Sequence, residues 1–136
     1  MTEDFRSENY FATYRLSDGI LTVEFKPDVI IDLRVAKKVV AARHELVKGQ
    51  VYPTMTVINN DYLLLEKDAY RYLGSADGVK YMSAGAIVIN SPLRRILTNF
   101  QLTFYKQKVP LRVFSSRSDA RLWLLDFIKD REEVGR

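Results

Sequence analysis

The sequence contains no cysteine and a single histidine, His44, among its 136 residues. A chain without cysteine cannot hold a disulfide, a thiolate zinc site, an iron–sulfur cluster or a cysteine nucleophile. One imidazole also excludes the metal sites that require two histidines. We therefore expect no resident metal ion and no cofactor.

Glycine is scarce, and its six copies form neither of the common phosphate-binding motifs. Neither G-x-G-x-x-G nor G-x-x-x-x-G-K-S/T occurs, which excludes a P-loop and argues against dinucleotide binding. No serine lies in a G-x-S-x-G motif, and His44 is the sole imidazole that could serve as its base. The carboxylates of Glu66 and Asp68 are two residues apart on a predicted helix, so they point in different directions. These absences predict a protein that is not an enzyme.

The sequence also lacks long hydrophobic runs. The run at residues 84–89 is far shorter than the roughly 20 residues that a membrane-spanning helix needs. The acidic start, with Glu3 and Asp4, is not followed by the apolar core of a signal peptide. We expect a cytoplasmic protein without a membrane span.

Charge is unevenly distributed along the chain. There are 21 lysines and arginines against 17 acids, a formal net charge of +4. Residues 1–78 hold ten basic and twelve acidic side chains, whereas residues 79–118 hold no acid at all. The basic residues of this acid-free segment are Lys80, Arg94, Arg95, Lys106, Lys108, Arg112 and Arg117. They could attract an anionic partner, or acids from other segments could neutralise them in the folded chain. They are too sparse for specific nucleic-acid binding, and we expect none.

Hydrophobic periodicity and turn residues predict a single α/β domain with the element order ββαβαβαβα. The strands are expected at residues 10–16, 20–25, 54–58, 84–89 and 111–114, and the helices at 33–48, 66–73, from 92 onward and at 117–129. This order indicates a mixed, mostly parallel sheet flanked by helices, with the opening hairpin as an antiparallel edge. We expect the domain to span residues 10–129, between a flexible N-terminus at 1–9 and a charged tail at 130–136.

Several local signals mark the ends of these elements. Gly19 suits a tight turn between the first two strands, because a glycine adopts positive φ without strain. Asp32 is placed to cap the first helix, which Gly49 would end. Ser116 and Asp119 have the spacing of a capping box at the start of the last helix.

The first candidate binding site lies where the strand at residues 84–89 runs into the following helix. Free backbone amides, the positive end of the helix dipole and two arginines could hold an anion at the carboxyl edge of the sheet. The alternative is a capped helix whose arginines extend into water. The candidate ligand-binding residues are Asn90, Ser91, Arg94 and Arg95.

The second candidate site lies at the carboxyl end of the strand at residues 54–58 and at the start of the next helix. This place suits a partner-binding loop, and the alternative is a simple connection between a strand and a helix. The candidate partner-binding residues are Asn60, Asp61, Tyr62, Glu66, Lys67 and Tyr70.

A series of short strings occurs in an order typical of one group of small α/β domains. The strings are Asp18-Gly19-Ile20, Lys26-Pro27, Ile31-Asp32-Leu33, Tyr52-Pro53, Asn90-Ser91-Pro92, Arg95-Ile96, Asn99-Phe100, Phe114-Ser115 and the later Ala120, Trp123 and Leu124. They lie between about residues 10 and 128. In these strings and in the order of its elements, the chain resembles small bacterial domains of the STAS and CRAL-TRIO-like fold, also called SpoIIAA-like or anti-anti-sigma factor-like.

The resemblance implies a non-enzymatic module that binds a partner protein. Some STAS domains are switched by phosphorylation of a Ser or Thr where the second helix starts. Residues 63–71 of this chain contain neither, so the resemblance carries no phosphorylation site to it. The CRAL-TRIO side of the resemblance implies an apolar ligand.

Two functions are therefore open. The first is a regulatory or protein-interaction domain of the STAS-like type with a protein partner, which could also form a homodimer. The alternative is a carrier or sensor of a small lipid or anionic ligand, which the acid-free segment and the helix start at Ser91 favour.

Overall fold

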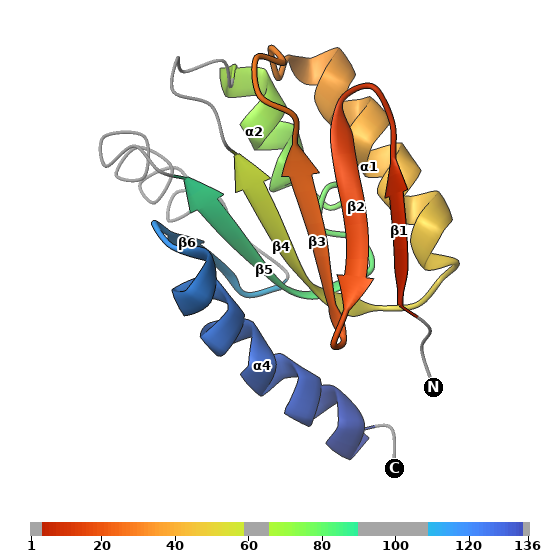
Figure 1. Ribbon diagram of the computed structural model, residues 1–136, viewed down its shortest axis with the longest axis vertical. Coiled ribbons are helices and arrows are strands. Elements are labelled where there is room, and N and C mark those ends of the chain that lie inside the picture. The colour runs from red at the N-terminus through yellow and green to blue at the C-terminus, as the bar shows by residue number, and fades with distance from the viewer. Residues whose placement is uncertain (1–3, 59–65, 90–108, 135–136) are drawn as a thin grey trace.

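The computed structural model describes residues 4–58, 66–89 and 109–134, which form one mixed α/β domain (Figure 1). The elements are β1 (Phe5–Glu8), β2 (Ala12–Ser17), β3 (Ile20–Phe25), α1 (Leu33–Val47), β4 (Tyr52–Ile58), α2 (Lys67–Leu73), β5 (Met82–Ile89), β6 (Leu111–Phe114) and α4 (Arg117–Val134). The six strands form one sheet in the order β1-β2-β3-β4-β5-β6. β1, β2 and β3 are antiparallel, and β3 to β6 run parallel. The predicted fold class, a single α/β domain with a mixed sheet flanked by helices, is confirmed.

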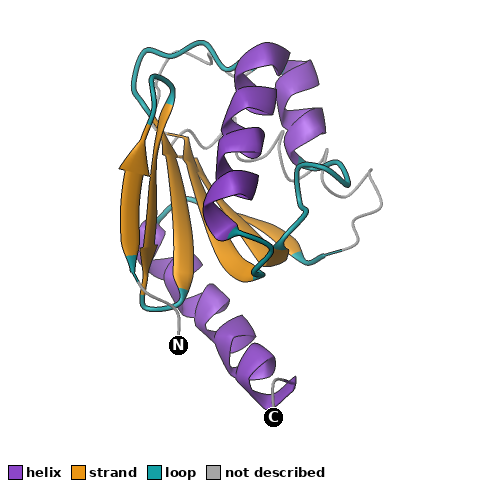
Figure 2. Cartoon of the chain, turned by 90° about the vertical axis from the view of Figure 1, so that its right-hand side faces the viewer, coloured by secondary structure: helices purple, strands orange, loops and turns teal. Residues whose placement is uncertain are grey.

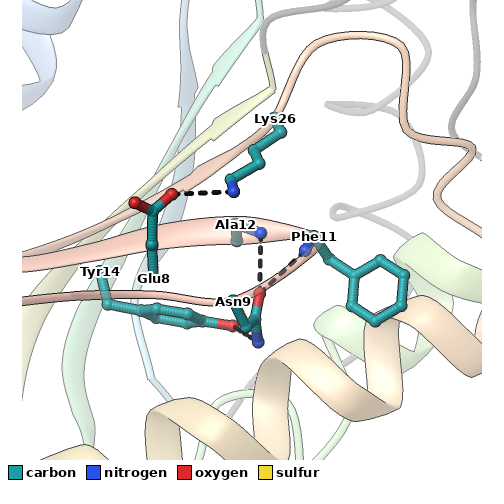
Figure 3. A network of polar contacts seen from close by, with 6 residues as sticks. All are labelled: Glu8, Asn9, Phe11, Ala12, Tyr14 and Lys26. Carbon is teal, nitrogen blue, oxygen red and sulfur yellow. Dashed lines mark hydrogen bonds and ion pairs between the residues drawn. The ribbon is translucent and has the colours of Figure 1, made fainter.

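The N-terminus departs from the prediction, because a strand occupies part of the expected flexible segment 1–9. β1 pairs with β2 from Phe5↔Leu16 to Glu8↔Thr13. The Asn9 side chain shapes the turn: its Oδ1 accepts hydrogen bonds from the backbone N–H of Phe11 and of Ala12, both at 2.9 Å (Figure 3). Short polar strands carry a weak sequence signal, because their pairing partner rather than their own pattern stabilises them.

One further difference concerns the last part of the chain. α4 extends to Val134, so the helix includes most of the segment expected as a charged tail from residue 130. The helix expected from residue 92 onward lies outside the described residues. The other predicted helices and strands are present, with ends that coincide with the prediction or shift by one or two residues.

Local signals define the ends of two helices as expected. Asp32 Oδ1 accepts a hydrogen bond of 2.8 Å from the N–H of Val35, which satisfies one of the free amides at the start of α1. Gly49 has φ +80° just beyond the end of the same helix. At α4, the N–H of Asp119 donates to Ser116 Oγ at 3.1 Å, which is one half of the expected capping box.

The sheet separates two hydrophobic clusters. On one side α1 and α2 lie over it (Figure 2). Buried side chains such as Tyr14, Phe25 and Val39 form the cluster on this side. On the other side α4 packs Ala120 and Leu124, both fully buried, onto β4 and β5. Alternate residues of each strand supply the two clusters, because successive side chains point to opposite faces.

The two faces of the sheet are covered to different extents. α4 packs mainly on β4 and β5, with fewer contacts to β3 and β6. It then crosses toward the turn between β2 and β3, where a Cβ on Gly19 would lie 3.2 Å from Ile128 Cδ1. Among the described elements, no helix lies over β1 and β2 on this side, so their outer face is open (Figure 1).

Candidate functional site

The open face of the sheet, together with the flank of α4, forms a polar groove of about 780 Å³, which we call the arginine groove. Its lining residues are Arg6, Thr13, Arg15, Ser17, Asp18, Thr22, Glu24, Met55, Arg117, Ser118 and Arg121. They come from β1 to β4, from the turn between β2 and β3, and from the first turns of α4. The groove is therefore assembled from both ends of the chain.

The floor of the arginine groove follows from the pairing register. One row across the strands consists of Arg6, Arg15, Thr22 and Met55, because each is the direct partner of the next. The N-terminal strands alternate apolar residues, which face α1, with polar residues, which face the groove. Two arginines consequently stand directly opposite each other on neighbouring strands.

The row beside it holds two acids, of which Glu24 lines the groove. Glu8, Thr13 and Glu24 are successive partners on β1, β2 and β3. Glu8 Oε2 lies 2.8 Å from Lys26 Nζ (Figure 3), and Glu24 Oε2 lies 2.8 Å from a terminal nitrogen of Arg117. Both acids next to the arginine row are thus already held by other cations.

The α4 wall of the groove presents two arginines one helical turn apart. Arg117 pairs with Glu24, and Arg121 pairs with Asp18 Oδ2 at 2.9 Å. Arg117 belongs to the acid-free segment at residues 79–118. Its counter-charge comes from Glu24, an acid outside that segment, which is one of the two alternatives that the sequence left open. These two pairs fasten the start of α4 to β3 and to the β2–β3 turn.

The uncompensated charge of the groove lies on Arg6 and Arg15. Within the described parts of the chain, the Arg15 side chain forms no ion pair and no hydrogen bond. The pKa of Glu8 is lowered chiefly by its hydrogen bond and charge interaction with Lys26, and the charge of Arg6 adds a small further lowering. Among the described lining residues there are four arginines and two carboxylates, which gives these residues an excess of two positive charges.

A second, smaller space lies between the sheet and α1. It is an apolar cavity of about 40 Å³, lined mainly by aliphatic side chains such as Val39, Ile58 and Leu73, with Arg43 as its charged member. A water molecule needs roughly 10–15 Å³ of such space, so the cavity has room for a few waters. It is too small for the chain of a lipid.

Arg43 has a structural task at this cavity. The residue is 2% exposed, and its guanidinium donates hydrogen bonds of 2.9 Å to the carbonyl oxygens of Gly78 and Lys80. Burial lowers the pKa of Arg43 to about 10, so the group stays charged at neutral pH. The arginine clamps the turn between α2 and β5 onto α1.

Sequence reasoning did not single out Arg43, although a signal for its burial exists. Position 43 continues the buried stripe of Ala36, Val39 and Val40 at helical spacing on α1. A charged residue on the buried stripe of a helix indicates a polar partner in the interior, because an unpaired charge is costly to bury.

The predicted site residues fall mostly outside the described parts of the chain. The anion-site candidates Asn90, Ser91, Arg94 and Arg95 all lie there. Of the partner-site candidates, Asn60, Asp61 and Tyr62 lie there as well.

The other three partner-site candidates lie at α2. Glu66 and Lys67 are exposed at its start, and the N–H of Glu66 donates to the carbonyl of Ile31 at 3.0 Å. Tyr70 lies within α2. The arginine groove was not among the predicted sites, although the alternation of Thr13, Arg15 and Ser17 with buried residues marks a polar strand face.

The described residues offer neither a metal site nor a membrane span. They contain no cluster of three or more His, Asp or Glu side chains that could hold a metal ion. No helix in the same parts of the chain combines the length and the apolar character needed to cross a membrane.

Comparisons with known proteins place the chain in a family. The profile described as "Domain of unknown function (DUF7793)" matches residues 14–128. No curated protein matches the sequence. A solved structure with which the chain shares similarity is an uncharacterized protein of the DUF3478 family, with a SpoIIAA-like fold, from Shewanella loihica PV-4. It has 13% sequence identity and a TM-score of 0.48, with 90% of this chain and 92% of that chain covered. Neither the family description nor that of this structure names a CRAL-TRIO-like fold.

Proposed function

Since the chain belongs to the DUF7793 family, a domain of unknown function, we propose its function from geometry: it is a non-catalytic interaction module that binds a partner protein in the arginine groove. The observation that carries this proposal is the open face of β1 and β2. A sheet normally buries one face and leaves the other either solvated or covered by further elements. Here α4 lies along one end of that face, and together they enclose a groove with a volume of about 780 Å³.

The described side chains that line the arginine groove are better suited to binding a partner than to catalysing a reaction. The groove contains arginines, small hydroxyl residues and two carboxylates, and both carboxylates are engaged in ion pairs. A general base must be free to accept a proton within hydrogen-bond reach of its substrate. Glu24 and Asp18 are poor candidates for that role, because each already accepts a hydrogen bond from an arginine side chain, Glu24 from Arg117 and Asp18 from Arg121.

The alternative, a carrier or sensor of a small ligand, divides into two cases. The lipid case is disfavoured by the cavity beneath α1, whose volume of about 40 Å³ accommodates a few waters. The case of a small anionic ligand remains a second candidate, because Arg6 and Arg15 bring uncompensated positive charge into the groove. A regulatory role and homodimer formation are both compatible with the proposal, which requires neither of them.

Site-specific photocrosslinking in the native host tests this proposal. A photoreactive phenylalanine analogue replaces Thr22 on the groove floor, and matched variants carry it at Lys38 on the exposed face of α1 and at Glu66 at the start of α2. We expect one partner protein to be captured from position 22 and not from position 38.

Three results would count against docking in the groove. These are capture of the same proteins from positions 22 and 38, no capture from position 22, and capture from position 66 alone. The last result would instead support the site predicted at the second helix.

A further inference from the structure

We propose that the arginine groove recognises an acidic, extended segment of its partner protein, whose carboxylates pair with Arg6 and Arg15. The inference rests on the proposed function and adds to it the chemistry of the partner. It is carried by three observations: the direct pairing of two arginines across strands, the engagement of Glu8 and Glu24 in the neighbouring row, and the composition of the groove lining.

The first observation is that Arg6 and Arg15 are direct cross-strand partners. Like charges placed opposite each other in a sheet destabilise it, so this pair costs the isolated fold some stability. An anion between the two guanidinium groups would convert the repulsion into two attractions. Free energy that the fold loses without a ligand would then be recovered on binding.

The second observation is that both acids of the neighbouring row are occupied. Glu8 is paired with Lys26, and Glu24 is paired with Arg117, both at 2.8 Å. Neither carboxylate is therefore free to neutralise Arg15, which lies diagonally between them on β2. The charge that remains available on the groove floor is that of the two arginines.

The third observation is the kind of group that this lining suits. A guanidinium forms a planar fork that matches a carboxylate with two parallel hydrogen bonds. Thr13 and Thr22 flank the arginines and offer hydroxyl groups to the same ligand. In an extended segment, side chains on one face repeat about every 6.6–6.8 Å, and cross-strand Cα atoms lie about 4.5–5.5 Å apart. The long, flexible arginine side chains can make up the difference between the side-chain spacing of the bound segment and the spacing of the two arginine Cα atoms.

The same lining is poorly suited to nucleic acid. Proteins that bind single strands provide aromatic side chains on which bases stack, and duplex binding neutralises many phosphates at once. The described lining residues include neither an aromatic side chain nor a lysine, and their two carboxylates limit the excess charge to two. A protein segment with a few carboxylates fits this modest excess better than a continuous phosphate backbone.

Fluorescence anisotropy of the full chain with a labelled octaglutamate peptide, at about 50 mM salt, tests the inference. The variants are Arg6→Glu and Arg15→Glu, and the matched control is Lys38→Glu, which makes the same charge reversal on exposed α1. We expect each groove variant to weaken binding by about tenfold or more, and the control by less than about twofold. Arg15→Lys, which keeps the charge but not the planar fork, should give an intermediate loss.

Three results would overturn the inference. An equal loss in Lys38→Glu would assign binding to net charge rather than to the groove. Tighter binding of single-stranded DNA or of inorganic polyphosphate, lost in Arg15→Glu, would assign the groove to phosphate instead. Absence of octaglutamate binding, with photocrosslinking from position 22 retained, would reject the acidic segment and leave the interaction module intact.

Discussion

A buried arginine without a carboxylate is unusual, because an unpaired charge loses its hydration when it leaves water. Arg43 meets this cost by donating to two backbone carbonyls, those of Gly78 and Lys80. The turn that carries these carbonyls also has no room for a side chain at Gly78, where a Cβ would collide with the carbonyl oxygen of Tyr72. Arg43 and Gly78 therefore act together to hold the end of α2 against α1.

Replacing Arg43 by alanine should lower the free energy of unfolding by about 2–4 kcal/mol. The change removes the guanidinium donor from the carbonyls of Gly78 and Lys80, the first of them in a buried hydrogen bond, and removes the packed side-chain stem. Urea unfolding measures the effect, and Lys38→Ala on the exposed face of the same helix should change it by less than about 0.5 kcal/mol. Equal stability of the two variants would show that the clamp is not needed.

The surroundings of His44, at the same turn, predict that the free energy of unfolding depends on pH. Its Nε2 lies 3.0 Å from the carbonyl oxygen of Asp77, and burial, followed by the charge of Arg43, lowers the pKa of its imidazole. In the window below the ordinary pKa of about 6.5, the unfolded chain therefore binds the proton more readily than the folded chain does. Stability contributed by neutral His44 should be present above that pKa and be lost as the pH falls.

Urea unfolding at about pH 7.5 and about pH 5.5, on either side of that ordinary pKa, would measure this contribution. We expect the drop in the free energy of unfolding between the two pH values to be smaller in His44→Gln than in the unaltered chain. Carboxylates titrate in both proteins, so their effect cancels in the comparison. An identical drop in both would mean that His44 does not couple the turn to pH.

At the scale of elements, α4 shows how one helix can both complete a core and build a site. Its inward residues Ala120 and Leu124 are fully buried on β4 and β5. Its arginines at positions 117 and 121 face the groove and pair with Glu24 and Asp18. The packing of the buried stripe therefore fixes the position of the groove wall.

Leu124 and Leu122 provide a matched pair on this helix, because Leu124 is fully buried and Leu122 is 66% exposed. Leu124→Ala should lower the free energy of unfolding by about 2–5 kcal/mol, since it removes buried methyl groups and leaves a cavity. Leu122→Ala should change it by less than about 0.5 kcal/mol. Thermal or urea unfolding distinguishes them, and a large loss in Leu122→Ala would place α4 differently on the sheet.

At the scale of the whole molecule, the described helices cover the two faces of the sheet to different extents. α1 and α2 lie over one face, and α4 covers part of the other (Figures 1 and 2). Because α4 covers only part of its face of the sheet, a groove can form beside the helix while the core beneath the helix stays packed. If the groove is a binding surface, its charges are placed for a partner rather than for the stability of the isolated fold.

Arg15→Thr should consequently stabilise the free protein by about 0.2–1 kcal/mol at low salt, because it removes the repulsion with Arg6. Threonine also suits a strand. Arg6→Thr should give a similar gain, and the double variant should gain less than the sum of both, since one repulsion is removed only once. Added salt should shrink each gain. A loss of stability in both single variants would indicate that the arginines serve the fold instead.

Local features of the fold could be read from the sequence. Asp32, Gly49 and Ser116 mark helix ends through backbone chemistry that acts within a few residues. Residues 111–114 were predicted as a strand with the ends that the structure has. β1 was missed, because its four residues depend on β2 and on the Asn9 turn for their hydrogen bonds.

The sequence by itself thus determined the order of the described elements from β2 onward, the starts of α1 and α4, and the absence of cysteine chemistry, since these depend on composition and on short-range contacts. The arginine groove was decided by tertiary structure alone. Arg6 meets Arg15 through strand register, and Arg121 meets Asp18 across 103 positions of sequence. Such contacts depend on how the sheet pairs and where α4 packs, which no local pattern encodes.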